Sequence, residues 1–285
     1  MQSITLILFY FGKFPDWSNL FFESLKKNYT IKFVFYTDCD FSDYLSDNII
    51  FKNCTFEQYL DKINTSLKIN FYPENIYKLC DIVPFYGIIH EDDIKNSDFY
   101  GYCDSDLIFG DIRKFYTHDI LSKHDVLSTH DDILSGHFAL FRNNELNRNM
   151  GFKIGGWKEK LETSFCLGLG ESNLAKAYFK ENEYRKNRFF GLSKFIKSKR
   201  PVRLYFKEQY TTPFVPIKWL DGSVNSDQPN VWYYKDGIIT NNRDMNRSFM
   251  YIHFMNFKSS KYRHDGTRAP WEKLEQITKW SWSKT

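Results

Sequence analysis

Two aspartates separated by a single residue, Asp104 and Asp106, are the part of the sequence best suited to chemistry. In extended backbone, alternate side chains point the same way, so both carboxylates would face one ligand. Carboxylate oxygens are the ligands that hard divalent cations prefer. A cation held there could bind a diphosphate and stabilise its charge as it leaves. The spacing therefore predicts a metal-dependent site at residues 104–106.

Two other kinds of acidic motif also begin with aspartates at this spacing. An EF-hand loop needs Gly at its sixth position and Glu at its twelfth. Counted from Asp104, those positions hold Phe109 and Phe115, so an EF-hand is excluded. An aspartyl-phosphate phosphatase also has this motif after an apolar strand and would use Asp104 as its nucleophile. Such enzymes carry the motif near the N-terminus, with a small hydroxyl residue where Ile108 stands here, and they remain the alternative enzyme class.

The predicted elements around the aspartates place them at a sheet edge. The apolar residues 99–103 predict a strand that runs directly into Asp104. Strands and helices alternate before it, which predicts a mostly parallel sheet with helices on its faces. Ligands of such sheets bind outside the carboxyl ends of the strands. The earlier elements are strands at 4–11, 31–36 and 49–51, and helices opening at Pro15-Asp16, at a capping box over 55–58 and at Pro73, the last ending at Pro84.

The second half of the chain has fewer regular patterns. Strands are expected at 126–129, 136–141 and 249–254, and a helix at 174–186. The last third reads as loop-rich, with Gly222 and Gly237, and residues 270–282 carry apolar residues near helical spacing. With no repeat and no linker, we expect one α/β domain over residues 1–285 with an elaborated C-terminal region.

Composition excludes several classes of protein. Aromatic residues make up 19% of the 285 residues, which excludes a mainly disordered chain or a coiled coil. A net charge of +4 is too small to indicate nucleic-acid binding. The five cysteines form no C-x-x-C pair, which favours a reduced, cytoplasmic setting over a zinc site or disulfides. The apolar run at 4–11 is shorter than the roughly 20 residues that cross a bilayer.

Segments 77–81 (YKLCD), 84–87 (PFYG) and 101–112 (GYCDSDLIFGDI) together resemble bacterial polysaccharide glycosyltransferases of the capsule and O-antigen type. Segments 9–17, 35–38, 135–143 and 253–258 fit the same family, and the resemblance is strongest over residues 4–145. It implies a GT-A-like (Rossmann-like) fold, with a nucleotide-sugar-binding half at 1–145 and an acceptor-side half with a C-terminal extension at 146–285. Such enzymes move a sugar from a nucleotide diphosphate to a hydroxyl of a growing glycan.

The resemblance also implies a metal site. In this family the D-x-D carboxylates hold Mn²⁺ or Mg²⁺ on the donor diphosphate, and a UDP-sugar is the favoured donor. Carried over, Asp106 is a direct metal ligand and Asp104 contacts the ribose or the metal. His253 would complete the site, which favours Mn²⁺, and Lys258 would meet the diphosphate. The alternative for His253 is a core histidine on a strand.

Nucleotide recognition is assigned by the resemblance to the loops after the first two strands. Gly12 allows close backbone approach, and Tyr10 or Phe11 can stack on a base. Lys13 belongs to the same exit loop. Asp38 can accept a hydrogen bond from a base N–H, or it is a plain turn residue.

The remaining candidates lie on helices and loops. Lys78 and Asp81, three apart on one helix face, would reach the donor phosphate and sugar or pair with each other. An inverting reaction needs a base near the acceptor hydroxyl, for which Asp131, Asp132 and Glu171 are candidates. Glu171 is alternatively a solvated first-turn charge. A retaining enzyme lets the leaving phosphate take the proton, and we favour retention.

A basic and aromatic segment at 185–207 suggests a location and an acceptor. Such a segment could lie on an anionic membrane at the inner face of the cell membrane, which suits a lipid-linked acceptor, or it is a solvated loop. Because it has no RNP or KH pattern, nucleic acid is not expected as a partner. A non-catalytic carbohydrate-binding protein, with aromatic residues stacked on sugars, is the alternative outside the enzymes.

Overall fold

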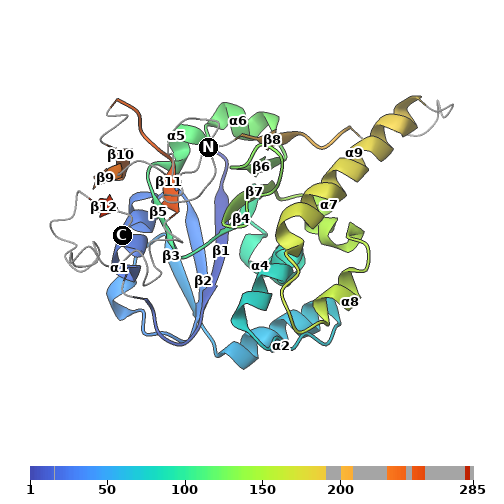
Figure 1. Ribbon diagram of the computed structural model, residues 1–285, viewed down its shortest axis with the longest axis horizontal. Coiled ribbons are helices and arrows are strands. Elements are labelled where there is room, and N and C mark those ends of the chain that lie inside the picture. The colour runs from blue at the N-terminus through green and yellow to red at the C-terminus, as the bar shows by residue number, and fades with distance from the viewer. Residues whose placement is uncertain (16, 191–199, 208–229, 242–245, 254–279, 283–285) are drawn as a thin grey trace. The chain divides into compact units, whose positions relative to one another are not determined.

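The computed structural model describes residues 1–15, 17–190, 200–207, 230–241, 246–253 and 280–282 (Figure 1). The chain forms two compact units that interleave along the sequence. The first unit comprises residues 1–7, 54–102 and 118–207. The second comprises the described residues among 8–53, 103–117 and 208–285. The prediction of one domain over residues 1–285 stays a prediction.

The main sheet has seven strands in the order β3-β2-β1-β4-β7-β6-β8. Within it β1 pairs with β4, β2 with β3, and β6 with β8 in parallel, while β6 and β7 are antiparallel. The predicted α/β fold with a mostly parallel sheet is therefore confirmed. The strands are β1 (Ile4–Tyr10), β2 (Lys32–Thr37), β3 (Ile49–Asn53), β4 (Phe99–Cys103), β6 (Val126–Ser128), β7 (Phe138–Arg142) and β8 (Leu204–Phe206).

The first helix of the first unit, α2 (Phe56–Leu67), begins at the predicted capping box. The Gln58 backbone N–H donates to Thr55 Oγ1 over 3.2 Å, and the Thr55 N–H donates to Gln58 Oε1 over 2.9 Å. These reciprocal bonds satisfy two helix-end donors that have no partner within the helix. The buried face of α2 carries Tyr59, Leu60, Ile63 and Leu67.

The helix predicted from Pro73 to Pro84 differs in the structure. Residues Ile76–Phe85 form a 3₁₀-helix, η2, which begins after Asn75 and contains Pro84. It runs into α3 (Tyr86–Ile89) and then α4 (Glu91–Ile94). In a 3₁₀-helix the side chains at i and i+3 eclipse each other, which aligns Lys78 with Asp81. Ile76, expected on the apolar face, is exposed.

The rest of the first unit is helical apart from its strands. The helix predicted at 174–186 is confirmed as α9 (Leu174–Phe190), and a π-helical turn, η4 (Leu169–Asn173), precedes it. In Figure 1, α7 and α9 lie on the same side of β7. The remaining elements are α6 (His118–Lys123), α7 (Glu145–Arg148), η3 (Met150–Lys153) and α8 (Trp157–Leu161).

The second unit has an aromatic core. Helix α1 (Ser18–Lys27) buries Leu20, Phe21 and Leu25, as its spacing predicts. Phe22 packs against Phe35 of β2, with ring centroids 5.4 Å apart. The unit also contains η1 (Ser42–Tyr44), β5 (Leu107–Phe109), α5 (Ile112–Phe115) and β11 (Tyr251–His253). Strand β11 confirms the central part of the strand predicted at 249–254.

A hairpin in the second unit corrects the loop-rich interpretation of the last third. Strands β9 (Asn230–Lys235) and β10 (Ile238–Asn241) are joined by Asp236 and Gly237, with φ of 51° and 79°. Asp-Gly is a favoured two-residue hairpin turn because both positions need positive φ. β12 (Trp280–Trp282) pairs with β9, so residues 280–282 are a strand and not the end of a helix. Residues 270–279 lie outside the described part of the chain.

None of the helices in the described residues is long and apolar enough to cross a membrane.

Candidate metal centre

The two aspartates lie in the short turn that joins β4 to β5. Asp106 is buried at 4% exposure, whereas Asp104 is exposed. Trp17 holds the turn from the start of α1, because its indole Nε1–H donates to the Ser105 carbonyl over 3.0 Å. No local sequence pattern indicates this contact, because it joins segments 88 residues apart.

His253 reaches the aspartates through strand pairing. Antiparallel β5 and β11 place His253 opposite Leu107, the residue after Asp106. His253 Nε2 then lies 3.5 Å from Asp106 Oδ1, and both side chains are buried. The pairing continues past β5, since the Gly110 N–H donates to the Met250 carbonyl over 2.8 Å. A Cβ at position 110 would lie 2.6 Å from the Phe249 carbonyl oxygen, so this approach requires glycine.

Asp104, Asp106 and His253 together form a donor set for a cation. One ligand atom from each lies within 4.8 Å of the others. In a six-coordinate site with bonds of about 2.1 Å, ligand atoms are roughly 3 to 4.2 Å apart, so small side-chain rotations suffice. Two carboxylate oxygens and one imidazole nitrogen suit Mn²⁺ and also accept Mg²⁺. Three protein ligands leave coordination positions for oxygen atoms of a substrate.

The neighbouring Cys103 adds no thiolate. Burial raises the pKa of the Cys103 thiol well above its usual value, and the charges of Asp104 and Asp106 raise it further. A neutral thiol is a poor ligand for a hard cation, so the donor set consists of oxygen and nitrogen atoms.

A backbone hydrogen bond to a side chain joins the loops after β1 and β2. The Gly12 N–H donates to Asp38 Oδ1 over 2.6 Å, and Gly12 has φ of +96°, which favours glycine. A Cβ at Gly12 would have no neighbour within 4 Å, so the space beside it is open. Lys13 is exposed, and Tyr10 and Phe11 are half-buried. The role of these five residues toward a nucleotide stays a prediction.

In the first unit, Lys78 and Asp81 pair with each other. Both side chains are 0% exposed, and Lys78 Nζ lies 2.9 Å from Asp81 Oδ2. Lys78 also donates to the Lys160 carbonyl and Thr163 Oγ1. Asp81 accepts the N–H groups of Leu167 and Leu169, each over 2.8 Å. The pair therefore ties the segment before α9 to η2, and a contact with the donor stays a prediction.

The candidate bases also lie in the first unit. The Glu171 carboxyl group rests against Gly136, where a Cβ would collide with its Oε1. Partial burial of this group raises its pKa, although the residue as a whole is exposed. Asp132 is exposed on the loop after β6. His137, just before β7, is buried, and its Nε2 lies 3.1 Å from Ser135 Oγ.

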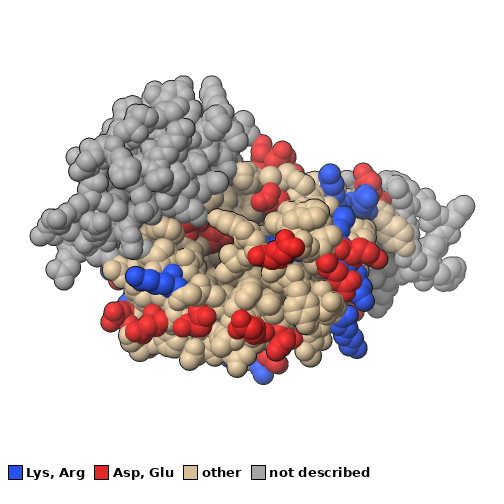
Figure 2. Space-filling view, turned by 60° about the horizontal axis from the view of Figure 1, so that its bottom comes forward, with Lys and Arg blue, Asp and Glu red and all other residues tan. Residues whose placement is uncertain are grey.

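Some of the predicted residues cannot be placed. Lys258 lies outside the described residues, as does much of the basic segment at 185–207. Of the described part, Arg185 pairs with Glu181 and Arg203 with Asp125. Figure 2 shows Lys and Arg side chains beside Asp and Glu side chains at the end where α9 lies.

Comparison with known proteins gives one family match. A model described as "Family of unknown function (DUF6625)" matches residues 6–279. No curated protein matches the chain.

Several solved structures are similar to the chain at low identity. A galactosyltransferase LgtC in complex with donor and acceptor sugar analogues is 12% identical, with 95% of this chain and 94% of that chain covered and a TM-score of 0.44. Mouse xyloside xylosyltransferase 1 is 9% identical, with 63% of this chain and 83% of that chain covered and a TM-score of 0.38. The glycosyltransferase GlyE of Streptococcus pneumoniae is 13% identical, with 73% of this chain and 55% of that chain covered and a TM-score of 0.31. Similarity of this extent carries no argument about activity.

Proposed function

The chain belongs to the family of unknown function DUF6625, and we propose from its own residues that it is a metal-dependent glycosyltransferase. It would move a sugar from a nucleotide diphosphate donor, with a UDP-sugar favoured, to a hydroxyl of a growing bacterial surface glycan. The observation that carries the proposal is the gathering of Asp104, Asp106 and His253 within 4.8 Å. The sequence resemblance to GT-A polysaccharide enzymes supports it.

The chemistry of this donor set supports a diphosphate substrate. Two neighbouring carboxylates repel each other, and a divalent cation between them removes that repulsion. Asp106 would hold the cation from the turn before β5 and His253 from β11, and the exposed Asp104 would bind the cation or the ribose. A bound cation would supply neutralisation of the charge on the leaving diphosphate. Catalysis then depends on positioning and electrostatics rather than on a protein nucleophile.

The base of the nucleotide would meet the loops after β1 and β2. The hydrogen bond from Gly12 to Asp38 fixes the two loops relative to each other. The open space beside Gly12 leaves room for a flat ring. Tyr10 or Phe11 would stack on that ring, and Lys258 would meet the diphosphate.

The acceptor side is expected to use the first unit. Partial burial raises the pKa of Glu171, which makes its carboxylate a stronger base, and Asp132 is the other candidate base. Retention remains the favoured outcome, with the leaving phosphate as proton acceptor. NMR of the product distinguishes the two outcomes, because inversion would give the opposite anomer and require a base.

The central experiment is a thermal shift assay with a panel of nucleoside diphosphates, each with and without Mn²⁺. We expect a shift with one nucleotide only when Mn²⁺ is present, and no shift in Asp106→Asn. Asp43→Asn is the matched control, since Asp43 is an exposed aspartate of η1 in the same unit. A full panel without any shift would contradict the proposal.

Assays of phosphate release distinguish the proposed transferase from a phosphatase that uses Asp104. A phosphatase would release phosphate from simple esters without a nucleotide sugar, and Asp104→Asn would abolish that release.

A lipid-linked acceptor at the inner membrane face is tested by flotation with anionic liposomes at low salt. Absence of binding there would contradict the membrane part of the proposal alone.

A further inference from the structure

A cavity of about 410 Å³ lies in the first unit, and Asp104, Asp106 and His253 are not among the residues that line it. It is bounded by α7, the middle of α9 and the chain that enters β8. Its polar wall is formed by Asn144, Glu145, Asn147, Arg185, Arg200 and Arg203. Its volume lies within the range of about 300–1,000 Å³ that is usual for small-molecule sites.

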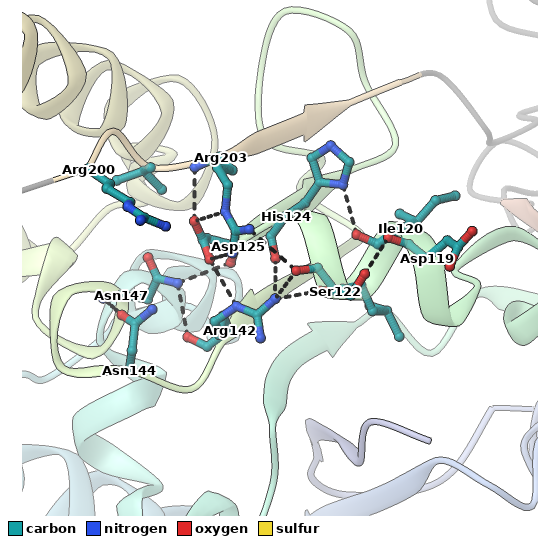
Figure 3. A network of polar contacts seen from close by, with 12 residues as sticks. Asp119, Ile120, Ser122, His124, Asp125, Arg142, Asn144, Asn147, Arg200 and Arg203 are labelled. Atoms are coloured by element: carbon teal, nitrogen blue, oxygen red, sulfur yellow. Dashed lines mark hydrogen bonds and ion pairs between the residues drawn. The ribbon is translucent and has the colours of Figure 1, made fainter.

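One side of the cavity is fixed by Asp125, shown in Figure 3. Arg203 donates to both Asp125 oxygens, over 3.0 and 2.8 Å, and Arg142 Nε donates to Oδ1 over 2.9 Å. Burial alone would raise the pKa of Asp125, but these hydrogen bonds outweigh it and lower the pKa. Asp125 is therefore ionised at neutral pH, and the guanidinium of Arg203 is held in place by it.

Another part of the cavity wall is held by a second cluster, which includes two residues of α9. Glu181 accepts from Arg185 Nε over 2.6 Å and pairs with Lys153 over 2.9 Å. Arg185 Nη1 donates to the Arg200 carbonyl over 2.6 Å, so the chain at Arg200 is anchored to the helix. The Arg185 side chain is only 9% exposed. Hydrogen bonds within the protein thus hold an arginine side chain in each of these parts of the wall.

After these contacts, positive charge remains at the cavity. Each of the two carboxylates, Asp125 and Glu181, has two cationic partners. Among the described residues, the Arg200 guanidinium has no hydrogen bond or ion pair. Figure 3 shows it on the same side of Asp125 as Asn144 and Asn147. Asp125 in the wall is already paired, and the other carboxylate among the residues that line the cavity is Glu145, which is exposed at the start of α7.

We propose that this cavity binds the carboxylate or phosphate group of an acidic sugar. A guanidinium presents paired N–H donors that match the oxygens of either group. Arg200 would make this contact, assisted by the second Nη of Arg185. The apolar side chains of Leu146 and Val202 also line the cavity and would contact the sugar ring. The site needs no metal, so it does not rest on the proposed transferase activity.

The test is isothermal titration of the full chain in EDTA with glucuronate, glucose 6-phosphate, glucose and inorganic phosphate. We expect the two acidic sugars to bind, glucose not to bind, and inorganic phosphate to bind at least tenfold more weakly than glucose 6-phosphate. Chelating metal ions keeps the Asp104–Asp106–His253 group from contributing. Failure here leaves the transferase proposal untouched, which depends on Mn²⁺ and nucleotide.

Variants locate the binding. Arg200→Gln should weaken glucuronate binding at least tenfold without changing the melting temperature, because Arg200 is exposed. Lys176→Gln, an exposed cation elsewhere on α9, should leave binding unchanged. Glu145→Gln should tighten binding by removing the opposing charge. Absence of binding by both acidic sugars, an unchanged Kd in Arg200→Gln, or equal affinity for bare phosphate would overturn the proposal.

Discussion

Two buried aspartates in this molecule have opposite surroundings. Asp81 in the first unit is fully buried beside Lys78, and its oxygens accept two backbone N–H groups. Asp106 in the second unit is nearly as buried, but its close neighbours include a second carboxylate, Asp104, and the imidazole of His253. The first aspartate has a permanent cationic partner in the chain. The second lies in a group of ligand atoms that suits a cation from solution.

The different surroundings of Asp81 and Asp106 distinguish a charge that stabilises the fold from a charge that is available to bind a cation. Removing a buried carboxylate from water costs several kcal/mol unless a partner compensates it. Lys78 provides that compensation at 2.9 Å, and the pair then holds the segment that leads to α9. Like charges brought together raise the energy of a site, and a divalent cation lowers it. We therefore read Asp81 as a structural group and Asp106 as a ligand.

The largest expected effect is on the compensated pair. Lys78→Met leaves Asp81 buried without its cation, which should lower the free energy of unfolding by about 3–5 kcal/mol. Chemical denaturation monitored by circular dichroism measures this loss.

The double variant Lys78→Met/Asp81→Asn is the control, because Asn removes the charge and keeps one oxygen that accepts from one of the two N–H groups, those of Leu167 and Leu169. It should be more stable than Lys78→Met alone. If Lys78→Met were as stable as wild type, the structural role of the pair would be wrong.

Asp106→Asn should behave in the reverse way. Without a charged ligand, metal-dependent hydrolysis of the nucleotide sugar should fall at least about 100-fold, or roughly 3 kcal/mol in activation free energy. The metal-free variant should be no less stable than wild type, because one of two neighbouring negative charges is gone.

Both quantities are measured on the same preparation, by coupled release of nucleoside diphosphate and by thermal melting in EDTA. A variant that keeps its metal-dependent activity would refute the ligand role of Asp106. A large loss of metal-free stability would make Asp106 a structural group like Asp81.

His90 shows a third arrangement, in which burial favours the neutral form of the side chain. Burial lowers the pKa of His90 to about 4, against the smaller opposing effect of Asp93. A histidine with a lowered pKa stabilises the fold fully above its unfolded pKa of about 6.5, and this is lost as pH falls toward 4. Unfolding free energy should therefore fall by about 3 kcal/mol between pH 6.5 and pH 4.

His90→Gln removes the titrating group, and urea titrations across this pH range should show a flatter decline than wild type. Tyr59, whose hydroxyl lies 3.1 Å from His90 Nε2, keeps a polar neighbour in this variant. An identical decline in both proteins would show that His90 is not the group responsible.

The smallest expected effect tests how the metal ligands are brought together. Gly110→Ala places a methyl group 2.6 Å from the Phe249 carbonyl and should destabilise the protein by about 1–3 kcal/mol. It should also weaken Mn²⁺ binding, because β11 and His253 would shift from β5. Gly155→Ala is the matched control, since no atom lies within 4 Å of its Cβ position. Equal Mn²⁺ affinity in both variants, measured by titration calorimetry, would exclude this role of Gly110.

The elements that local sequence patterns determine were predicted well. The apolar runs gave strands β1, β2 and β4 within a residue or two, and the Thr55–Gln58 capping box gave the start of α2. Asp104 and Asp106 followed from their position after β4. Their partner His253 came only from the family resemblance, because 147 residues separate it from Asp106 and no spacing connects them.

The failures have physical causes. Pro84 was read as a helix stop, but the 3₁₀-helix η2 contains it and the chain continues as helix at Tyr86. The Asp236-Gly237 hairpin was missed although its turn signal is present. Trp17 and Gly110 act through tertiary contacts with backbone carbonyls, which no local pattern reveals. No local pattern indicates the pairing of Asp125 with Arg142 and Arg203 either, since the two arginines come from separate segments.

The pairing of β5 with β11 also determines when, during synthesis, all three proposed metal ligands can come together. Residues far apart in sequence meet late, because a long loop must close before their contact is gained. During synthesis, the two aspartates leave the ribosome well before His253, and the nascent chain then has only two of the three ligands. The complete ligand set is thus first available after β11 has docked. A cation bound by all three of the proposed ligands would therefore show that β11 has docked on β5.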